Sequence, residues 1–175
     1  MDMRCRVCII GPPCSGKSEL FEKFTYIKRK HVSIGTEFGT VEITLKTGNT
    51  LKMYIWDTIG LEKHKEFIET YVINSDIVLV VFDTNSFKSA ENMLESWLPF
   101  AEKVLTANGI KVDNIVILGV QTYHEPTVSS NSSRNIVIDK CIECGYPYFE
   151  CSADYSVAKT ILHQIAYKFL RACEL

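Results

Sequence analysis

A short glycine-rich segment carries the clearest chemistry in this chain of 175 residues. It reads Gly11-Pro12-Pro13-Cys14-Ser15-Gly16-Lys17-Ser18, the spacing G-x-x-x-x-G-K-[ST]. An apolar run over residues 4–10 precedes it, and a helical pattern over residues 17–28 follows. Phosphates are multiply charged and need converging backbone N–H groups, which a loop at a helix N-terminus supplies. The segment therefore predicts a phosphate-binding loop.

Each part of this loop has an expected role. Lys17 reaches the β and γ phosphates, the Ser18 hydroxyl ligates Mg²⁺, and glycine lets the backbone approach closely. Pro12 and Pro13 have no N–H, so the donors must come from Cys14 onward. The nucleotide-binding residues expected here are Gly11, Cys14, Ser15, Gly16, Lys17 and Ser18.

A second segment, Trp56-Asp57-Thr58-Ile59-Gly60, directly follows an apolar strand pattern. An aspartate at a strand end suits a ligand of a Mg²⁺-bound water, and the N–H of Gly60 can be offered to a γ-phosphate. We therefore expect Asp57 and Gly60 to lie beside the phosphate loop.

Strand and helix patterns alternate along the chain. Strands are expected at residues 4–10, 38–46, 51–55, 77–82, 114–120 and 147–151. The second and third form a hairpin about the Thr47-Gly48-Asn49 turn, because their apolar residues alternate. Helices are expected at 17–28, 87–105, 134–144 and 155–172, with a break or kink at Pro99 and a loop over 121–133. This order predicts an α/β fold with a six-stranded, mostly parallel sheet, one antiparallel edge strand and helices on both faces.

Composition limits the class of protein. Hydrophobic residues make up 46% and charged residues 23%, which is typical of a globular chain, and the length suits one domain over residues 1–175. The net charge of −2 argues against a nucleic-acid binder. No apolar run approaches the ~20 residues of a membrane span. Ala172 stands where prenylation needs cysteine, so we expect no lipid anchor on this chain, unless a longer C-terminal tail carries one.

Seven cysteines without an apolar signal core indicate reduced thiols and a cytoplasmic protein. Cys5 and Cys8, like Cys141 and Cys144, have C-x-x-C spacing, which can mark a zinc site. Strand residues three apart point to opposite faces, however, so burial as small hydrophobic side chains is favoured for the first pair.

Together the two phosphate motifs resemble the Ras superfamily of small GTPases, over about residues 4–172, and within it the Rab-like proteins. The stretch from Ser33 to Phe38 resembles the first switch. The stretch from Phe82 to Phe87, followed by Trp97-Leu98, resembles the Rab strand-to-helix passage. The resemblance implies the P-loop NTPase fold of a Ras-like G domain, GTP or GDP with Mg²⁺ as ligands, and a protein effector at the switch regions. The effector surface that it implies consists of Phe38, Trp56 and Tyr71.

The chain departs from the family pattern in both halves of the implied site. Ser33 replaces the Mg²⁺-binding threonine of the first switch and keeps the hydroxyl, whereas Leu61 replaces the glutamine that orients water. Val120-Gln121-Thr122-Tyr123 stands at N-K-x-D and lacks the base-binding carboxylate. Ser152-Ala153-Asp154 stands at S-A-K and keeps the backbone turn but not the lysine. The resemblance adds Ser33, Asp57, Gly60, Ser152 and Ala153 to the nucleotide site and makes Ser18, Ser33 and Asp57 the metal ligands.

Three functions are compatible with these residues. One is a Rab-like GTP-binding switch or adaptor of the intracellular-transport type, with slow or absent hydrolysis and a guanine or mixed purine nucleotide. Another is a pseudo-GTPase scaffold that binds nucleotide weakly or permanently. A small-molecule kinase ranks last, because it needs a cationic lid and the five arginines form no such cluster. No residue is assigned as catalytic.

Overall fold

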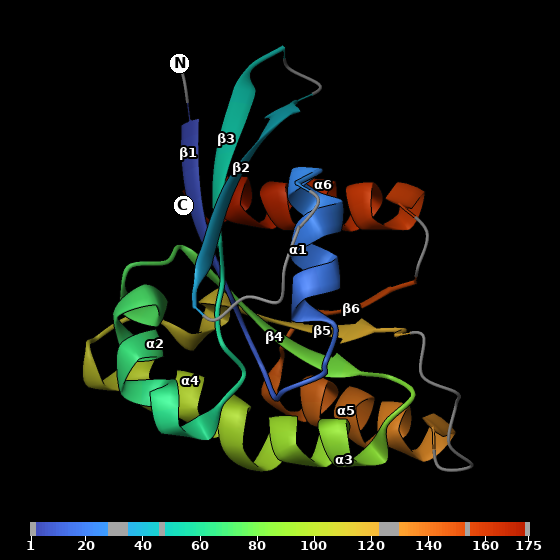
Figure 1. Ribbon diagram of the computed structural model, residues 1–175. Helices are drawn as coiled ribbons and strands as arrows, with labels where there is room; N and C mark the ends of the chain where they lie inside the picture. Colours follow the sequence, from blue (N-terminus) through green and yellow to red (C-terminus); the bar gives the residue numbers. More distant parts are fainter. Residues whose placement is uncertain (1–2, 28–34, 46–47, 123–129, 153–154, 174–175) are drawn as a thin grey trace.

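The computed structural model describes residues 3–27, 35–45, 48–122, 130–152 and 155–173. Its sheet has six strands in the order β2-β3-β1-β4-β5-β6 (Figure 1). The strands are β1 (Met3–Ile10), β2 (Glu37–Thr44), β3 (Thr50–Asp57), β4 (Ile77–Asp83), β5 (Ile115–Val120) and β6 (Tyr148–Cys151). The β2–β3 pair is antiparallel and the other pairs are parallel. The predicted sheet, with its one antiparallel edge strand, is confirmed.

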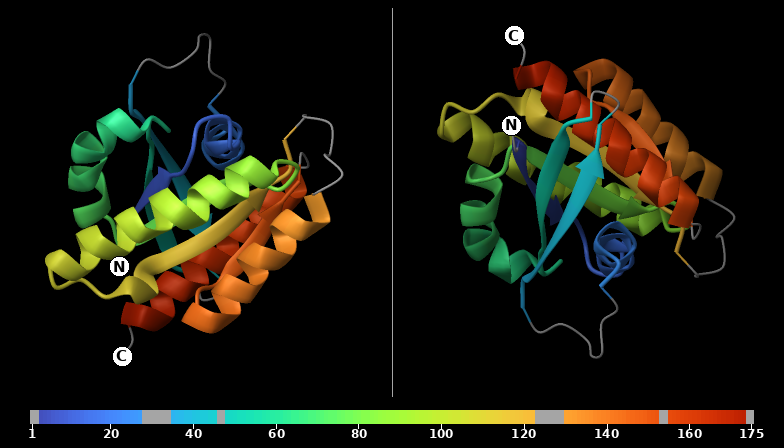
Figure 2. Two further views of the ribbon diagram at one scale, coloured as in Figure 1. Left: turned by 90° about the horizontal axis from the view of Figure 1, so that it is seen from below. Right: turned by 90° about the horizontal axis from the view of Figure 1, so that it is seen from above.

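Two groups of helices cover the two faces of this sheet (Figures 1 and 2). The helices are α1 (Lys17–Thr25), α2 (Lys65–Ile73), α3 (Phe87–Asn92), α4 (Leu98–Ala107), α5 (Ser130–Cys144) and α6 (Tyr155–Cys173). Short 3₁₀ turns lie at Glu62–His64 and Val112–Asn114. One apolar core lies under α1 and α6, and the other under α2 to α5. The prediction of helices on both faces is therefore confirmed.

Side chains along a strand point alternately to the two faces of the sheet, and therefore to the two cores. On β1, Cys5 and Ile9 belong to the core under α1 and α6, whereas Cys8 and Ile10 belong to the opposite core. The two thiols of the first C-x-x-C pair are thus buried on opposite faces and cannot share a zinc ion. Among the described residues, no group of three metal-ligating side chains is found.

The β2–β3 hairpin has the register that the alternating pattern predicts. Ile43 pairs with Leu51, and both are buried. Phe38 pairs with Trp56 near the other end of the hairpin. This register places both aromatic residues next to the carboxyl end of β3, whose last residue is Asp57.

Element boundaries differ from the expectations at three places. α1 ends at Thr25, and Tyr26 follows it with a left-handed φ of 58°. α5 begins at Ser130, inside the segment expected to be a loop, and Ser133 is fully buried there. The break expected at Pro99 lies just before it. A π-helical turn over Met93–Trp97 separates α3 from α4, and Pro99 stands in the first turn of α4, where its missing N–H costs least.

None of the helices within the described ranges combines the length and the apolar character needed to cross a bilayer.

Candidate functional site

The carboxyl ends of the five mutually parallel strands meet at one edge of the sheet, which is where α/β folds bind ligands. β1 ends at the glycine-rich loop, β3 at Asp57 and β4 at Asp83. β5 ends at Val120 and β6 at Cys151. The segments singled out from the sequence therefore converge here, although they are up to about 140 residues apart along the chain.

Lys17 lies in the middle of this edge, at the first position of α1. Only 6% of the side chain is exposed, and Nζ donates to the Pro12 carbonyl at 2.6 Å and to Ser15 Oγ at 3.3 Å. Burial lowers the pKa of the Lys17 ammonium to about 8, against the opposing effect of the Asp57 carboxylate. The loop thus holds a cation by its own carbonyl and hydroxyl groups, in a place with little access to water.

Ser18 and Asp57 form a pair of hard oxygen donors beside this lysine. Ser18 Oγ donates to Asp57 Oδ2 at 3.0 Å, and Asp57 is 3% exposed. Gly60 approaches from the segment after β3, where an added Cβ would lie 2.5 Å from Lys17 Nζ and 2.8 Å from the Gly11 carbonyl oxygen. The structure thus brings together four residues that the sequence predicted to be neighbours: Lys17, Ser18, Asp57 and Gly60.

A cavity of about 260 Å³ opens along the loop and the start of α1. Its lining consists of Cys14, Ser15, Gly16, Lys17, Ser18, Glu19 and Thr122. Gly16 has a φ of 87°, and an added Cβ would lie 2.6 Å from Val120 Cγ1. The loop therefore packs directly on the end of β5 and can do so only with glycine at this position.

The end of β5 is apolar where the family pattern has a polar side chain. Val120 is fully buried against Gly16, so it offers no hydrogen bond to a base. Ser152 follows β6, and its carbonyl accepts from Lys23 Nζ at 3.1 Å. Ser33, Tyr123 and Ala153 fall outside the described residues, and their expected roles stay predictions.

A buried polar network, to which the sequence patterns assigned no role, joins the end of β5 to β4. Asp83 is 1% exposed and accepts from Thr122 Oγ1 at 2.9 Å and from the Asn85 backbone N–H at 2.9 Å. Asn85 Nδ2 also donates to the Thr122 carbonyl at 3.1 Å. In the sequence, Asp83 and Asn85 stood out only as part of the Rab-like stretch from Phe82 to Phe87, and Thr122 only as part of the stretch at N-K-x-D. The network positions the segment that forms one wall of the cavity.

The segment after Gly60 begins with Leu61, which is 42% exposed at the position of the water-orienting glutamine. The following turn is held by Lys65, whose Nζ lies 2.6 Å from Glu62 Oε2 and 4.9 Å from the centre of the Trp97 ring. Ser96 Oγ donates to Glu62 Oε1 at 2.6 Å. Burial opposes ionisation of Glu62, but the hydrogen bonds from Lys65 and Ser96 outweigh it and lower the pKa of that carboxyl. These contacts fasten the start of α2 to the π-helical turn.

The three aromatic residues expected to form an effector surface are contiguous. The ring centres of Phe38 and Trp56 are 5.2 Å apart, and those of Trp56 and Tyr71 are 6.4 Å apart. Phe38 is 52% exposed, and the other two are partly buried. The cluster thus joins β2, β3 and α2 and presents an apolar ring to solvent beside the phosphate site.

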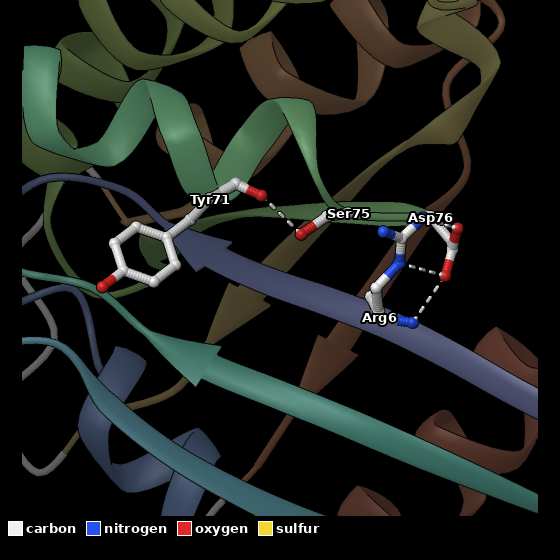
Figure 3. A network of polar contacts seen from close by, with 4 residues as sticks. All are labelled: Arg6, Tyr71, Ser75 and Asp76. Atoms are coloured by element: carbon white, nitrogen blue, oxygen red, sulfur yellow. Dashed lines mark hydrogen bonds and ion pairs between the residues drawn. The ribbon is translucent and has the colours of Figure 1, made fainter.

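Polar contacts at the end of α2 support this aromatic cluster (Figure 3). Ser75 Oγ donates to the Tyr71 carbonyl at 2.7 Å. The next residue, Asp76, accepts from the Arg6 backbone N–H at 2.7 Å and from Arg6 Nη2 at 2.9 Å. Because Arg6 belongs to β1, these bonds tie the helix that carries Tyr71 to the central strands of the sheet.

Comparison with known proteins gives one consistent result. The model of the Ras family matches residues 6–171. The chain is 30% identical over 149 residues to "Ras-related protein Rab-1" of Theileria annulata, covering 78% of this chain and 66% of that protein. It is 38% identical over 104 residues to "Ras-related protein Rab-11B" of Dictyostelium discoideum, covering 55% and 44%. It is 35% identical over 96 residues to "Ras-related protein rab-39" of Caenorhabditis elegans, covering 53% and 42%. The chain thus spans about half the length of the curated relatives it matches.

Proposed function

The chain belongs to the Ras family of small GTPases, and from this premise we propose that it is a Rab-like, GTP-binding switch or adaptor with slow or absent hydrolysis. It would act in the cytoplasm, in intracellular transport, through a protein effector at the switch regions. The observation that carries the proposal is the Lys17, Ser18 and Asp57 cluster beside the glycine-rich loop.

The donor set suits a Mg²⁺–triphosphate group. Lys17 is a buried cation, Ser18 and Asp57 are hard oxygen donors in contact, and the close approach of Gly60 leaves no room for a side chain between the loop and the segment after β3. Lys17 would hold the β and γ phosphates, and Ser18 and Asp57 would hold the cation. When bound, Mg²⁺ neutralises phosphate charge. These residues therefore support nucleotide binding.

Hydrolysis has less support. It needs a water molecule oriented in line with the γ-phosphate, and Leu61 can neither donate nor accept a hydrogen bond. Losing one preorganised group typically costs on the order of 10²–10³ in rate. Pro13, within the loop, would also add bulk without an N–H beside the γ-phosphate. We therefore expect the triphosphate form to persist, with the aromatic surface presented to a partner.

Base recognition is also expected to be weaker than in the family pattern. Val120 is buried and apolar, and Tyr123 stands where the pattern has a carboxylate. A competition assay of GTP against ATP and XTP tests this expectation. A thousandfold preference for GTP would show that another residue has taken over the base.

A pseudo-GTPase scaffold is the second candidate, and Leu61 together with the apolar Val120 favours it. The two candidates differ in what the purified protein carries. Denaturing the protein and identifying the released nucleotide by chromatography gives GTP for a persistent switch, GDP for one that turns over, and nothing for a scaffold.

The phosphate site itself is tested by calorimetry with Lys17→Ala. The variant loses a charge-assisted contact to phosphate, and binding should weaken strongly. Lys103→Ala, on the exposed side of α4, is the matched control and should bind as the wild type does. Equal affinities for Lys17→Ala and the wild type would mean that the loop does not bind phosphate.

A further inference from the structure

Glu19, in the first turn of α1, is a charged residue of the cavity to which nothing above assigns a role. Its Oε2 atom is inaccessible to solvent and has no hydrogen-bond partner among the described residues. Leaving a buried carboxylate oxygen unpaired costs free energy, more than for a neutral acceptor. Glu19 is half-buried and lines the cavity, so a donor on a ligand there is the partner available to its carboxylate group.

The helix geometry separates Glu19 from the phosphate and metal side of the site. Successive side chains on an α-helix are about 100° apart around the axis. Ser18 points to Asp57 at the end of β3, at a distance of 3.0 Å. Glu19 lies instead within electrostatic range of Cys151 at the end of β6. Burial raises the pKa of that thiol, the Lys23 charge lowers it and the Glu19 charge raises it further. Glu19 also shares the cavity wall with Thr122, directly after β5, and β3 and β5 lie on opposite sides of β1. Ser18 therefore reaches the β3 side of the site, and Glu19 lies toward the β5 side.

The other groups at this end have little capacity left for a ligand. The Thr122 hydroxyl donates to Asp83, and its Cγ2 methyl group is the part that lies next to Gly16. Val120 is apolar, and Lys23 donates to the Ser152 carbonyl. Glu19 is thus the one carboxylate among the described residues that line the cavity.

We propose that Glu19 is a specificity-determining residue, whose carboxylate accepts a hydrogen bond from the exocyclic amino group of a bound purine nucleotide. This inference rests on the proposed nucleotide site and names its base-selecting group. An ionised carboxylate accepts hydrogen bonds but cannot donate them. Both the 2-amino group of guanine and the 6-amino group of adenine supply the required donor. A ring without an amino group leaves the buried oxygen unpaired and should be rejected.

Two pairs of nucleotides show whether Glu19 binds the 2-amino group of guanine or the 6-amino group of adenine. GTP and ITP differ only in the 2-amino group, and ATP and purine riboside triphosphate differ only in the 6-amino group. We expect one pair to differ in affinity for the wild type by roughly ten- to a hundredfold, the usual effect of a hydrogen bond to a charged group. Binding is measured by calorimetry with Mg²⁺ present, on the full chain.

The matched variants are Glu19→Met and Glu22→Met, about one turn apart on α1. Methionine keeps the chain length and helix propensity but removes the acceptor. The affinity ratio within the discriminating pair should fall to nearly one in Glu19→Met and stay at the wild-type value in Glu22→Met, since Glu22 does not line the cavity. Glu19→Ala repeats the test with a smaller side chain, in case the methionine side chain disturbs the fold.

Results with the wild type or with the Glu19 variants can overturn the inference. If nucleotides bind in a Lys17-dependent manner but neither pair differs, or if the difference persists in both Glu19 variants, Glu19 does not read the base and the proposed function stands. If no nucleotide binds the wild type, the proposed function fails together with this inference.

Discussion

The buried ammonium of Lys17 makes nucleotide affinity depend on pH above neutrality. Its pKa is lowered to about 8, chiefly by burial. Phosphate attracts the charged form, so binding shifts the lysine back toward its protonated state. With a pKa of about 8, about nine tenths of the ammonium groups are charged at pH 7 and about one tenth at pH 9. We expect the affinity for nucleotide to be about tenfold lower at pH 9 than at pH 7.

The assay is calorimetric titration at fixed Mg²⁺ and ionic strength between pH 7 and pH 9, above the last titration of the terminal phosphate. Lys17→Arg is the matched control, because a guanidinium stays charged over this range. It should bind with an affinity that changes little with pH, whatever its absolute strength. A flat profile for the wild type, or the same slope in Lys17→Arg, would refute the argument.

The same pKa has an opposite consequence for the stability of the protein without nucleotide. The unfolded chain has Lys17 at its usual pKa of 10.5, so it binds more protons than the folded chain between about pH 8 and pH 10.5. The free energy of unfolding should therefore rise with pH in this window as far as Lys17 contributes to it. Urea unfolding of the wild type and Lys17→Met measures the contribution, which the variant should lack.

Five further substitutions test other parts of the protein. Leu61→Gln should speed single-turnover GTP hydrolysis by roughly 10²–10³, and His64→Ala should change it little; a wild-type rate abolished by His64→Ala would contradict this. Gly109→Ala should lower the free energy of unfolding by roughly 1–2 kcal/mol, because its φ is 68°. Gly16→Ala should lower the free energy of unfolding in urea by roughly 1–3 kcal/mol more than Gly109→Ala does, since the added Cβ would also meet the Val120 side chain at the end of β5. Lys65→Met should raise hydrogen exchange at the start of α2 while changing global stability by less than about 1 kcal/mol; unchanged exchange would mean that these contacts do not hold the segment.

The sequence alone was enough to predict the sheet and the phosphate side of the site. The apolar runs and alternating patterns predict all six strands, because burial on two faces or on one face leaves a different period in the chain. The spacing of Lys17 and Ser18 after Gly11 is a local property of one loop and one helix start, so it can be recognised without tertiary information. Asp57 is a further example, since its place at a strand end follows from the strand before it.

The remaining features depend on contacts between distant segments, which no local pattern records. α5 begins four residues earlier than expected, and Ser133 in its first turn is fully buried, although the local sequence resembles a loop. The polar network from Asp83 to Thr122 joins the ends of two strands that pair only in the sheet. Glu19 looks in the sequence like an ordinary helical glutamate. Only the fold places Glu19 in the cavity wall, with Thr122 from the end of β5, and leaves one of its carboxylate oxygens without a hydrogen-bond partner among the described residues.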